Sequence, residues 1–374
     1  MPSSTSSSDR PGLVIRQTAS DRPGVAQPVP ERDVPARPWL PLCACAFALM
    51  AGLVGVWEAH WRNYGALTGY YANDDSQWAA QRRRINEGEG GGTVLIGSSR
   101  VLFDVQLDVW QQSTGVRPIQ LALEGTSSVY LLEDLAADPD FTGRLLVGVA
   151  PDLFFSGYGY RTSAISGYHK EGPSRRIGHW LSQRLVEPYF AFYDRDFALG
   201  EVVARLDWPQ RPGMRGPQPV RKLSLMEADR NTHMWPKVVN DPAYRAMAQG
   251  IWASRVNGPP PPMINTHAKA EALGEKQIAR AVAAVKTLRA RGARIVFVRP
   301  PSGGDYFAFE QSAFPRARTW DELLRRTGMP GIHFEDYPQL QETDIPEWSH
   351  LSHAAAKRYT AALAPLVTKA WDEQ

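Results

Sequence analysis

The fold of this chain is decided by the stretch Thr93-Val94-Leu95-Ile96-Gly97-Ser98-Ser99-Arg100. Its first four residues predict a buried strand, because β-branched and aliphatic side chains suit a pleated sheet. The glycine and the two serines that follow predict a turn. A strand that ends in such a turn presents a serine hydroxyl at its tip, from Ser98 or from Ser99.

Strand and helix patterns alternate on both sides of a long interruption. Strands are predicted at 93–96, 118–123, 144–149 and 294–298, and helices at 129–135, 278–288 and 354–371. Short apolar strands that alternate with helices are typical of an α/β protein, with a parallel sheet covered by helices on both faces. The stretch of about 156–265 holds aromatic-rich helical pieces and proline-rich connectors. We expect it to be an insertion, either a cap over one sheet edge or a structural elaboration.

Composition and charge exclude some function classes. The 374 residues are 43% hydrophobic and 22% charged, which is ordinary for a globular protein. A net charge of +3 does not indicate nucleic-acid binding. The 12 tryptophans and 13 tyrosines suit either a packed core or a carbohydrate-facing groove.

The N-terminal part predicts a membrane anchor. Residues 1–37 are rich in Ser, Pro, Arg and Asp, and we expect a disordered tail. A transmembrane helix is predicted at 38–58, because 39–57 carries no charge and spans close to the ~30 Å hydrocarbon core. The alternative, a cleaved signal peptide, lacks a small-residue cleavage site. A membrane-proximal helix and linker are expected at 59–92, followed by the main domain at 93–374.

The arginines of the tail place it in the cytoplasm by the positive-inside rule, with the main domain outside the inner (plasma) membrane. Both cysteines, Cys43 and Cys45, fall inside the apolar segment. The exported part is therefore expected to have no disulfide and no thiol nucleophile.

The candidate site is expected at one edge of the sheet. In an open parallel sheet, ligands bind beyond the carboxyl ends of the strands. Ser99, Gly125, Asp152 and Arg299 each follow a predicted strand. The segment Glu347-Trp348-Ser349-His350-Leu351 precedes the last helix and is expected to fold over the same edge.

These residue types indicate acyl-transfer chemistry. A serine hydroxyl is a weak nucleophile that needs a base, and histidine is the usual one. Glu347 lies three residues before His350, so one turn brings its carboxylate to the imidazole, where it fixes the tautomer. The backbone N–H groups of Ser99 and Gly125 are the natural donors to an oxyanion.

The joint pattern resembles the SGNH, or GDSL-like, hydrolase superfamily. Its first block, strand-Gly-Asp-Ser, is matched by Gly97-Ser98-Ser99, and the resemblance makes Ser99 the nucleophile. Gly125 stands where the second block has its oxyanion glycine. The last block, Asp-x-x-His-Leu, is matched by Glu347 to Leu351. The resemblance covers about 93–155 and 275–370 and implies a three-layer, flavodoxin-like sheet.

One block of that pattern is missing. The third block reads Gly-x-Asn-Asp, and its asparagine donates to the oxyanion, whereas this chain has Gly148-Val149-Ala150-Pro151-Asp152. Three alternatives follow: two backbone donors suffice, another group such as Arg100 or Arg299 substitutes, or activity is reduced.

From these residues we expect a membrane-anchored serine esterase or acyltransferase without a cofactor or metal. The resemblance to membrane-anchored members of the superfamily implies that its substrate is an acyl group, most simply acetyl, on an extracytoplasmic glycan. Polysaccharide-export proteins are the expected partners, and nucleic acid is not. A second hypothesis is a decayed hydrolase that binds glycan or scaffolds an export complex. A metal-dependent hydrolase would use His350 and His353, but no His-Glu-x-x-His helix is present. Gly88 to Gly92 lacks the Lys-Ser/Thr of a phosphate loop.

Overall fold

The computed structural model describes residues 37–206, 222–259 and 265–374. The predicted disordered tail, apart from residue 37, and the proline-rich connector 209–219 lie outside these ranges. The chain divides into two units, one ending at Val56 and the other running from Trp57 to Gln374. The second unit holds the sheet and the candidate site.

The main sheet has five parallel strands in the order β2-β1-β3-β6-β7. Numbered along the chain within this sheet, the order is 2-1-3-4-5, which is a common doubly wound arrangement. The strands are β1 (Thr93–Ile96), β2 (Ile119–Gln120), β3 (Arg144–Gly148), β6 (Arg294–Arg299) and β7 (Gly331–His333). The predicted α/β class with a parallel sheet is therefore confirmed.

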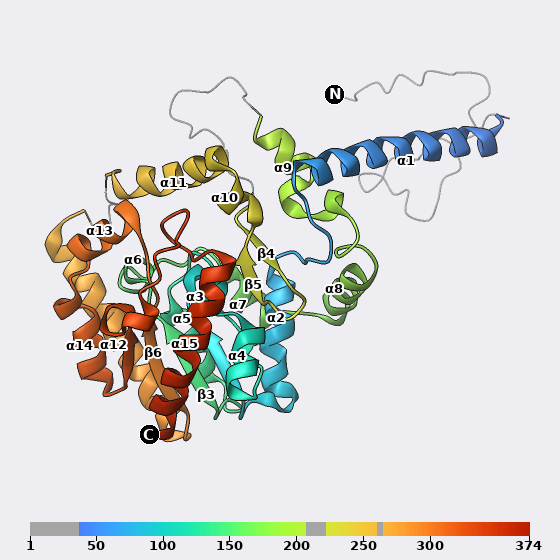
Figure 1. Cartoon of the computed structure of the whole chain (residues 1–374). Coiled ribbons are helices and arrows are strands. Elements are labelled where there is room, and N and C mark those ends of the chain that lie inside the picture. Colours follow the sequence, from blue (N-terminus) through green and yellow to red (C-terminus); the bar gives the residue numbers. More distant parts are fainter. Residues whose placement is uncertain (1–36, 207–221, 260–264) are drawn as a thin grey trace, which may run out of the picture. The chain divides into compact units, whose positions relative to one another are not determined.

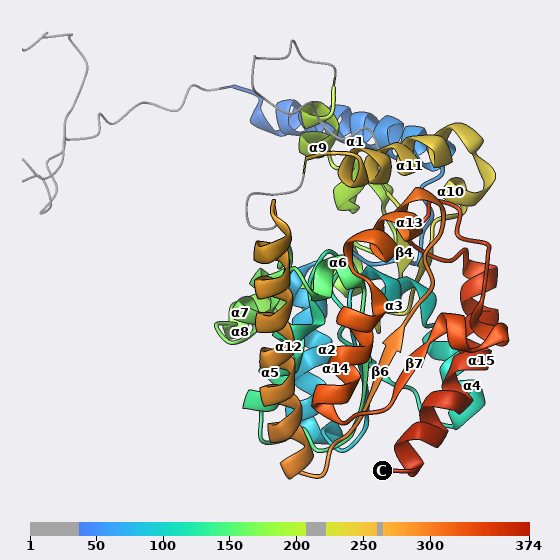
Figure 2. The same cartoon turned by 90° about the vertical axis from the view of Figure 1, so that its left-hand side faces the viewer.

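Helices cover both faces of this sheet, as Figures 1 and 2 show. Side chains alternate along each strand. Leu95, Leu146 and Val296 enter one apolar core, together with residues of the helices α3 (Ser99–Asp104), α4 (Leu107–Thr114) and α15 (His353–Asp372). Val94, Leu145 and Ile295 enter the other, with α5 (Ser128–Ala137), α12 (His267–Ala290) and α14 (Trp320–Thr327). Strands buried on both faces explain why the sequence shows continuous apolar runs.

The insertion is mostly helical. It also holds an antiparallel two-stranded sheet of β4 (Ser224–Met226) and β5 (Thr232–Met234), which the sequence did not predict. Its helices in the described residues are α7 (Thr162–Tyr168), α8 (Pro173–Leu185), α9 (Leu199–Ala204), α10 (Pro236–Asn240) and α11 (Pro242–Val256), with short 3₁₀ turns η2 (Ala191–Tyr193) and η3 (Arg195–Phe197). Short helices α6 (Pro151–Phe154) and α13 (Gly304–Ala313) follow β3 and β6.

Near the N-terminus, α1 (Trp39–Tyr64) is long and apolar enough to span a membrane, with a mean hydropathy of 2.1 over its most apolar window. Its last turns belong to the second unit. There Trp61 is 4% exposed and stacks on Phe197 of the insertion at 5.0 Å between ring centroids. The following helix, α2 (Asp75–Arg84), leads into a π-helical turn, η1 (Ile85–Glu89). Trp78 of α2 is fully buried and donates to the Leu121 carbonyl at 2.9 Å.

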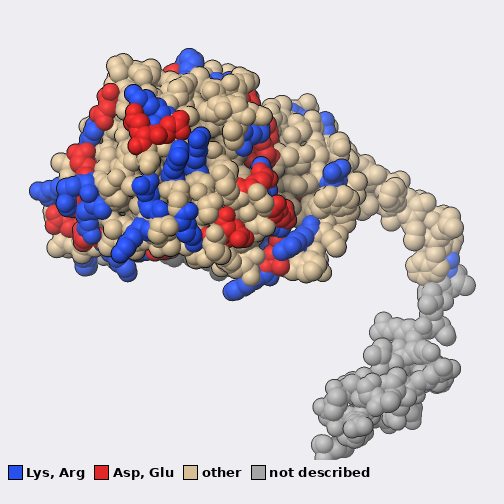
Figure 3. Space-filling model, turned by 90° about the horizontal axis from the view of Figure 1, so that it is seen from below, with Lys and Arg blue, Asp and Glu red and all other residues tan. Residues whose placement is uncertain are grey.

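Basic and acidic side chains intermingle on the face of the second unit seen in Figure 3. Many basic and acidic side chains of the described residues are paired, for example Arg325 with Glu322 at 2.5 Å and Arg316 with Asp336 at 2.7 Å. A mixed surface of this kind agrees with the small net charge of +3.

Candidate active site

Ser99 is the first residue of α3 and directly follows the turn after β1. Two glycines allow this helix to start so close to the sheet. A Cβ on Gly148 would lie 2.0 Å from Cγ2 of Val101, and one on Gly97 would lie 2.5 Å from the same atom. Only glycine leaves room for Val101 between the ends of β1 and β3, so these two positions fix where Ser99 lies.

Gly125 lies at the same edge of the sheet. The segment after β2 still pairs with the segment after β1, because Leu123 N donates to Gly97 O at 3.0 Å. Ser99 and Gly125 each follow this pair by two residues. Gly125 has φ +57°, which favours glycine. Within the described part of the chain, the N–H groups of Ser99 and Gly125 donate no hydrogen bond to the protein.

A buried histidine–carboxylate pair occupies the loop before α15. Nδ1 of His350 lies 2.6 Å from Oε1 of Glu347, and the two residues are 2% and 0% exposed. Because a carboxylate only accepts hydrogen bonds, the hydrogen belongs to Nδ1. Nε2 is then a lone-pair acceptor, and it is buried with no hydrogen-bond partner among the described residues.

The histidine packs against the helix that starts with Ser99. Its ring stacks on Phe103 at 4.2 Å between centroids and 21° between planes. Next to it, the Leu351 N–H donates to Oδ1 of Asp104 at 2.9 Å. Ser99 and Phe103 are four residues apart on α3 and therefore share a face of the helix. The imidazole thus lies on the face of α3 that carries the Ser99 side chain.

The loop between Glu347 and His350 has an unusual backbone. Trp348 has φ +71°, which is rare for a residue with a side chain and costs of order 1–3 kcal/mol. Its carbonyl accepts from Gly303 N at 2.8 Å. Its ring lies where a Cβ on Gly304 would come within 2.6 Å. Surrounding contacts therefore hold a strained turn that places Glu347 beside the imidazole.

Asp152 lies next to the position where the third block would have its asparagine, and its carboxylate is hydrogen-bonded to two other side chains. Its Oδ2 accepts from Nη2 of Arg255 at 3.0 Å and from the Tyr306 hydroxyl at 2.8 Å. Its Oδ1 is buried without a partner among the described residues. In this structure the carboxylate is held by α11 and α13.

Arg100 and Arg299 share one carboxylate. Glu310 accepts from Arg100 at 2.8 Å through Oε1 and from Arg299 at 2.7 Å through Oε2. Burial alone would raise the pKa of Glu310, but the two arginines together hold it below its usual range. In the described residues, Nε and Nη2 of Arg100 are buried without a partner. One edge of the Arg100 guanidinium, formed by Nε and Nη2, therefore has no hydrogen-bond partner among the described residues. In Arg299, by contrast, Nη2 also bonds Ser302 at 3.1 Å.

Several residues at the site were not predicted from the sequence. Trp252 Nε1 donates to Oε2 of Glu347, and Gln249 donates to Pro346 O at 2.8 Å. With Arg255, these residues recur every three positions on α11 and so share one face of that helix. Within the insertion, α11 therefore contacts Pro346, Glu347 and Asp152 of the candidate site.

Asp104 was also not predicted. It is fully buried, and burial raises the pKa of its carboxyl well above the usual range. Its Oδ1 accepts from the Leu351 N–H, so Asp104 connects α3 to the histidine loop.

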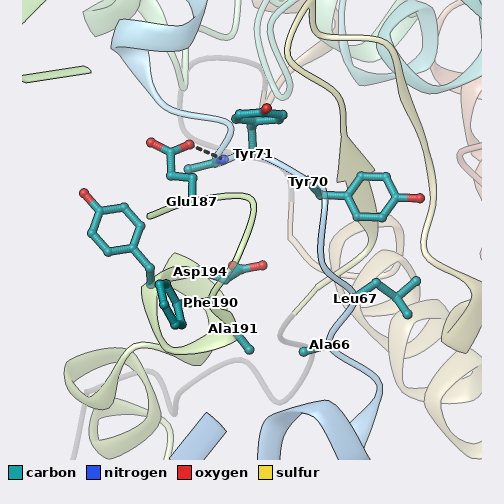
Figure 4. A pocket seen from close by; sticks show the side chains of 10 residues that line it. Ala66, Leu67, Tyr70, Tyr71, Glu187, Phe190, Ala191 and Asp194 are labelled. Carbon is teal, nitrogen blue, oxygen red and sulfur yellow. Dashed lines mark hydrogen bonds between the residues drawn. The ribbon is translucent and has the colours of Figure 1, made fainter. Parts of the chain in front are cut away.

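Two cavities lie in the second unit. The smaller one, lined by Tyr70, Tyr71 and Glu187 among others, holds about 20 Å³ and is shown in Figure 4. That is room for a single water molecule. The larger one, of about 410 Å³, lies beyond β3, β6 and β7. Among the described residues its lining includes Arg299 and Glu310 but not Ser99 or His350.

The described residues hold no group of three or more His, Cys, Asp or Glu side chains placed to bind a metal. His353 stacks on His233 at 4.0 Å, whereas His350 stacks on Phe103. The two histidines that a metal site would need therefore have different neighbours.

No family model matches this sequence, and no curated protein sequence matches it.

Proposed function

We propose that this chain is a membrane-anchored serine esterase or acyltransferase of the SGNH type. The observation that carries the proposal is the buried Glu347–His350 pair, with the unpartnered Nε2 of its imidazole packed on the helix that begins at Ser99. A histidine whose Nδ1–H is held by a carboxylate is arranged to accept a proton at Nε2. The sheet order 2-1-3-4-5 agrees with the flavodoxin-like layout that the SGNH resemblance implies.

The reaction has two halves. Oγ of Ser99 attacks the carbonyl carbon of the acyl group while its proton passes to Nε2 of His350. The oxyanion accepts hydrogen bonds from the free amides of Ser99 and Gly125. The intermediate then collapses to an acyl-serine, and His350 returns the proton to the leaving alkoxide.

In the second half, water or a sugar hydroxyl gives its proton to His350 and attacks the acyl carbon. Collapse releases the Ser99 hydroxyl, which takes the proton back from His350. Water yields an acid and makes the protein an esterase, whereas a sugar hydroxyl yields a new ester and makes it a transferase. Throughout, Glu347 stabilises the charged imidazolium.

The missing asparagine leaves the third oxyanion donor to be assigned. Asp152 is held by Arg255 and Tyr306, and an aspartate carboxylate cannot donate. Arg100 follows Ser99 directly and has an open guanidinium edge, so we propose it as the substitute donor. Arg299 supports it through their shared partner Glu310.

For location, we propose that α1 anchors the protein in the inner (plasma) membrane with its N-terminus in the cytoplasm. The arginines of the tail favour this orientation. The second unit would then meet glycans outside that membrane, together with polysaccharide-export proteins.

The proposal is tested by labelling with a fluorophosphonate probe, which reacts with an activated serine. The wild-type protein should be labelled, and Ser99→Ala should lose the label completely. His350→Gln should reduce labelling by about 10³-fold or more, since the base is removed. Labelling that persists in Ser99→Ala would remove Ser99 from this role.

A second candidate function is a non-catalytic glycan-binding or scaffold protein. It is favoured by the engaged Asp152, because no side-chain amide stands at the third oxyanion position. In that case wild type and Ser99→Ala would bind glycan equally, and neither would react with the probe.

A further inference from the structure

Two exposed tyrosines lie beside Gly125. Tyr158 is 46% exposed and Tyr160 is 66% exposed, although each is anchored through its backbone. Ser127 N donates to Tyr158 O at 2.7 Å, and Tyr160 N donates to Gly125 O at 3.1 Å. Between them, Gly159 forms an antiparallel bridge with Thr126. Residues two apart in an extended segment direct their side chains to the same side.

The position of Tyr160 depends on Gly125. A Cβ on Gly125 would lie 3.1 Å from Cβ of Tyr160 and 3.3 Å from its ring. Tyr160 therefore packs directly against Gly125, the glycine whose amide we assign to the oxyanion. A molecule stacked on the ring would lie next to the reacting carbonyl.

An arginine from α11 completes the surface. The Arg255 guanidinium lies 5.5 Å from the centroid of the Tyr158 ring, while one of its N–H groups bonds Asp152. Its side chain remains 40% exposed. An arginine side chain that is partly exposed beside the Tyr158 ring can offer N–H donors to a ligand there. Exposed aromatic surface with a polar rim marks a binding site.

The geometry points to a saccharide-binding platform formed by Tyr158 and Tyr160, with Arg255 as a hydrogen-bond donor at its rim. A pyranose ring has an apolar C–H face and hydroxyls at its edge. Tyrosine offers a flat apolar face and a polar tip, so the two surfaces are complementary. This inference rests on the proposed function and names where the glycan would lie: over Gly125, with an ester directed toward Ser99.

The test separates binding from catalysis. Binding is measured by titration calorimetry on the full-length Ser99→Ala protein, so that no turnover occurs, with cellohexaose as a neutral probe and a galacturonate hexamer as an acidic one. The platform predicts binding of at least one probe. Adding Tyr158→Ala and Tyr160→Ala should weaken it at least tenfold. Absence of binding to both probes would overturn the proposal.

Trp180 offers a matched control. It is 55% exposed on α8, and Arg184 lies 5.6 Å from its ring centroid, so it repeats the aromatic–arginine arrangement on a different element. Trp180→Ala should leave binding unchanged. An equal loss in this control, or unchanged binding in the double tyrosine variant, would contradict the platform.

The proposed catalysis is followed separately. In a protein with Ser99 intact, the wild type and Trp180→Ala should react with the fluorophosphonate probe at the same rate. Labelling of the wild type, together with loss of glycan binding in the double tyrosine variant, supports the platform. Binding without labelling of the wild type would contradict the proposed hydrolase and leave the platform standing.

Discussion

The carboxylate of Glu347 has two oxygens, and each has its own partner. Oε1 lies 2.6 Å from Nδ1 of His350, and Oε2 accepts from the indole N–H of Trp252. The carboxylate is completely buried, so these two hydrogen bonds fix its plane. Trp252 is therefore a positioning residue, which acts on the imidazole through Glu347.

Removal of the indole N–H should slow turnover without weakening binding. Trp252→Phe keeps a ring of similar shape but leaves Oε2 unpaired, and a hydrogen bond to a charged group is worth about 1.5–3 kcal/mol. We expect kcat for a small ester such as p-nitrophenyl acetate to fall roughly 10- to 100-fold, with KM within about twofold, since only the transition state uses the charged imidazole. Steady-state kinetics measure both.

The same change at an exposed tryptophan, Trp180→Phe, serves as the control and should leave kcat unaltered. A Trp252→Phe enzyme with wild-type kcat would show that Glu347 needs no second hydrogen bond.

For single residues, the sequence predicts contacts between side chains a few positions apart but not contacts between residues far apart in the chain. The pairing of Glu347 with His350 follows from a spacing of three residues. Trp252 lies 95 residues before Glu347, in a stretch without strand or helix alternation, so no local pattern connects them. Their contact depends on how the insertion folds back onto the sheet, and that is a tertiary property.

At the scale of elements, the position of α3 depends on small residues at two strand ends. Gly97 and Gly148 leave the space that Val101 fills, and any methyl group added there meets that side chain. A branched side chain between two strand ends cannot move aside without shifting its helix. The first residue of this helix is Ser99.

Gly148→Ala should therefore disturb both stability and the site. Overpacking of a tight core costs about 1–3 kcal/mol. We expect a melting temperature lower by roughly 2–12 °C, since each kcal/mol shifts a domain of about 150–250 residues by about 2–4 °C and a larger domain by no more. Fluorophosphonate labelling of Ser99 should also slow, because the displaced helix carries the serine. Calorimetry and timed labelling measure the two effects.

Gly178→Ala is the matched control in the middle of α8, where no atom apart from its chain neighbours and the backbone of its own helix lies within 4 Å of the added methyl. It should raise stability by about 0.5–1 kcal/mol, as alanine replaces glycine in a helix. Equal labelling rates for Gly148→Ala and wild type would show that Val101 does not set the position of Ser99.

The sequence predicts three of the five strands of the main sheet well and the other two poorly. β1, β3 and β6 are runs of Val, Leu and Ile buried on both faces, and their positions agree with the sequence patterns. β2 is only two residues long, where 118–123 was predicted, and the following residues pair without regular strand geometry. β7 reads Gly-Ile-His and has no strand signal of its own. It is a strand because Ile332 pairs with Val298 of β6.

For the whole molecule, two buried histidines contribute to the change of stability with pH. Burial, together with the charges of Arg299 and Arg316, lowers the pKa of His333 to about 3. Burial, together with His353 and Lys357, lowers the pKa of His233 to about 4. In the unfolded chain the pKa of a histidine is about 6.5.

Between the pKa of each buried histidine in the folded protein and its pKa of about 6.5 in the unfolded chain, the unfolded state binds more protons than the folded state. The stabilisation from neutral histidines is therefore complete above about pH 6.5 and is lost as the pH falls below it. Each histidine contributes a slope of at most about 1.4 kcal/mol per pH unit, and partial access of solvent reduces it. Asp196 acts in the opposite sense, because burial raises its pKa to about 6, and its protonation favours the folded state as the pH falls.

Since the two effects oppose each other, the pH slope of the wild type alone does not identify the histidines, and a variant is needed. His333→Asn keeps an acceptor for the Glu335 N–H, which bonds Nδ1 of His333 at 3.3 Å, but it cannot take up a proton. Its melting temperature should fall less between pH 7 and pH 5 than that of the wild type. His267→Asn, at an exposed position, should retain the wild-type slope. A His333→Asn protein whose stability falls as steeply as the wild type would show that the folded state accommodates a charged imidazole beside Arg299.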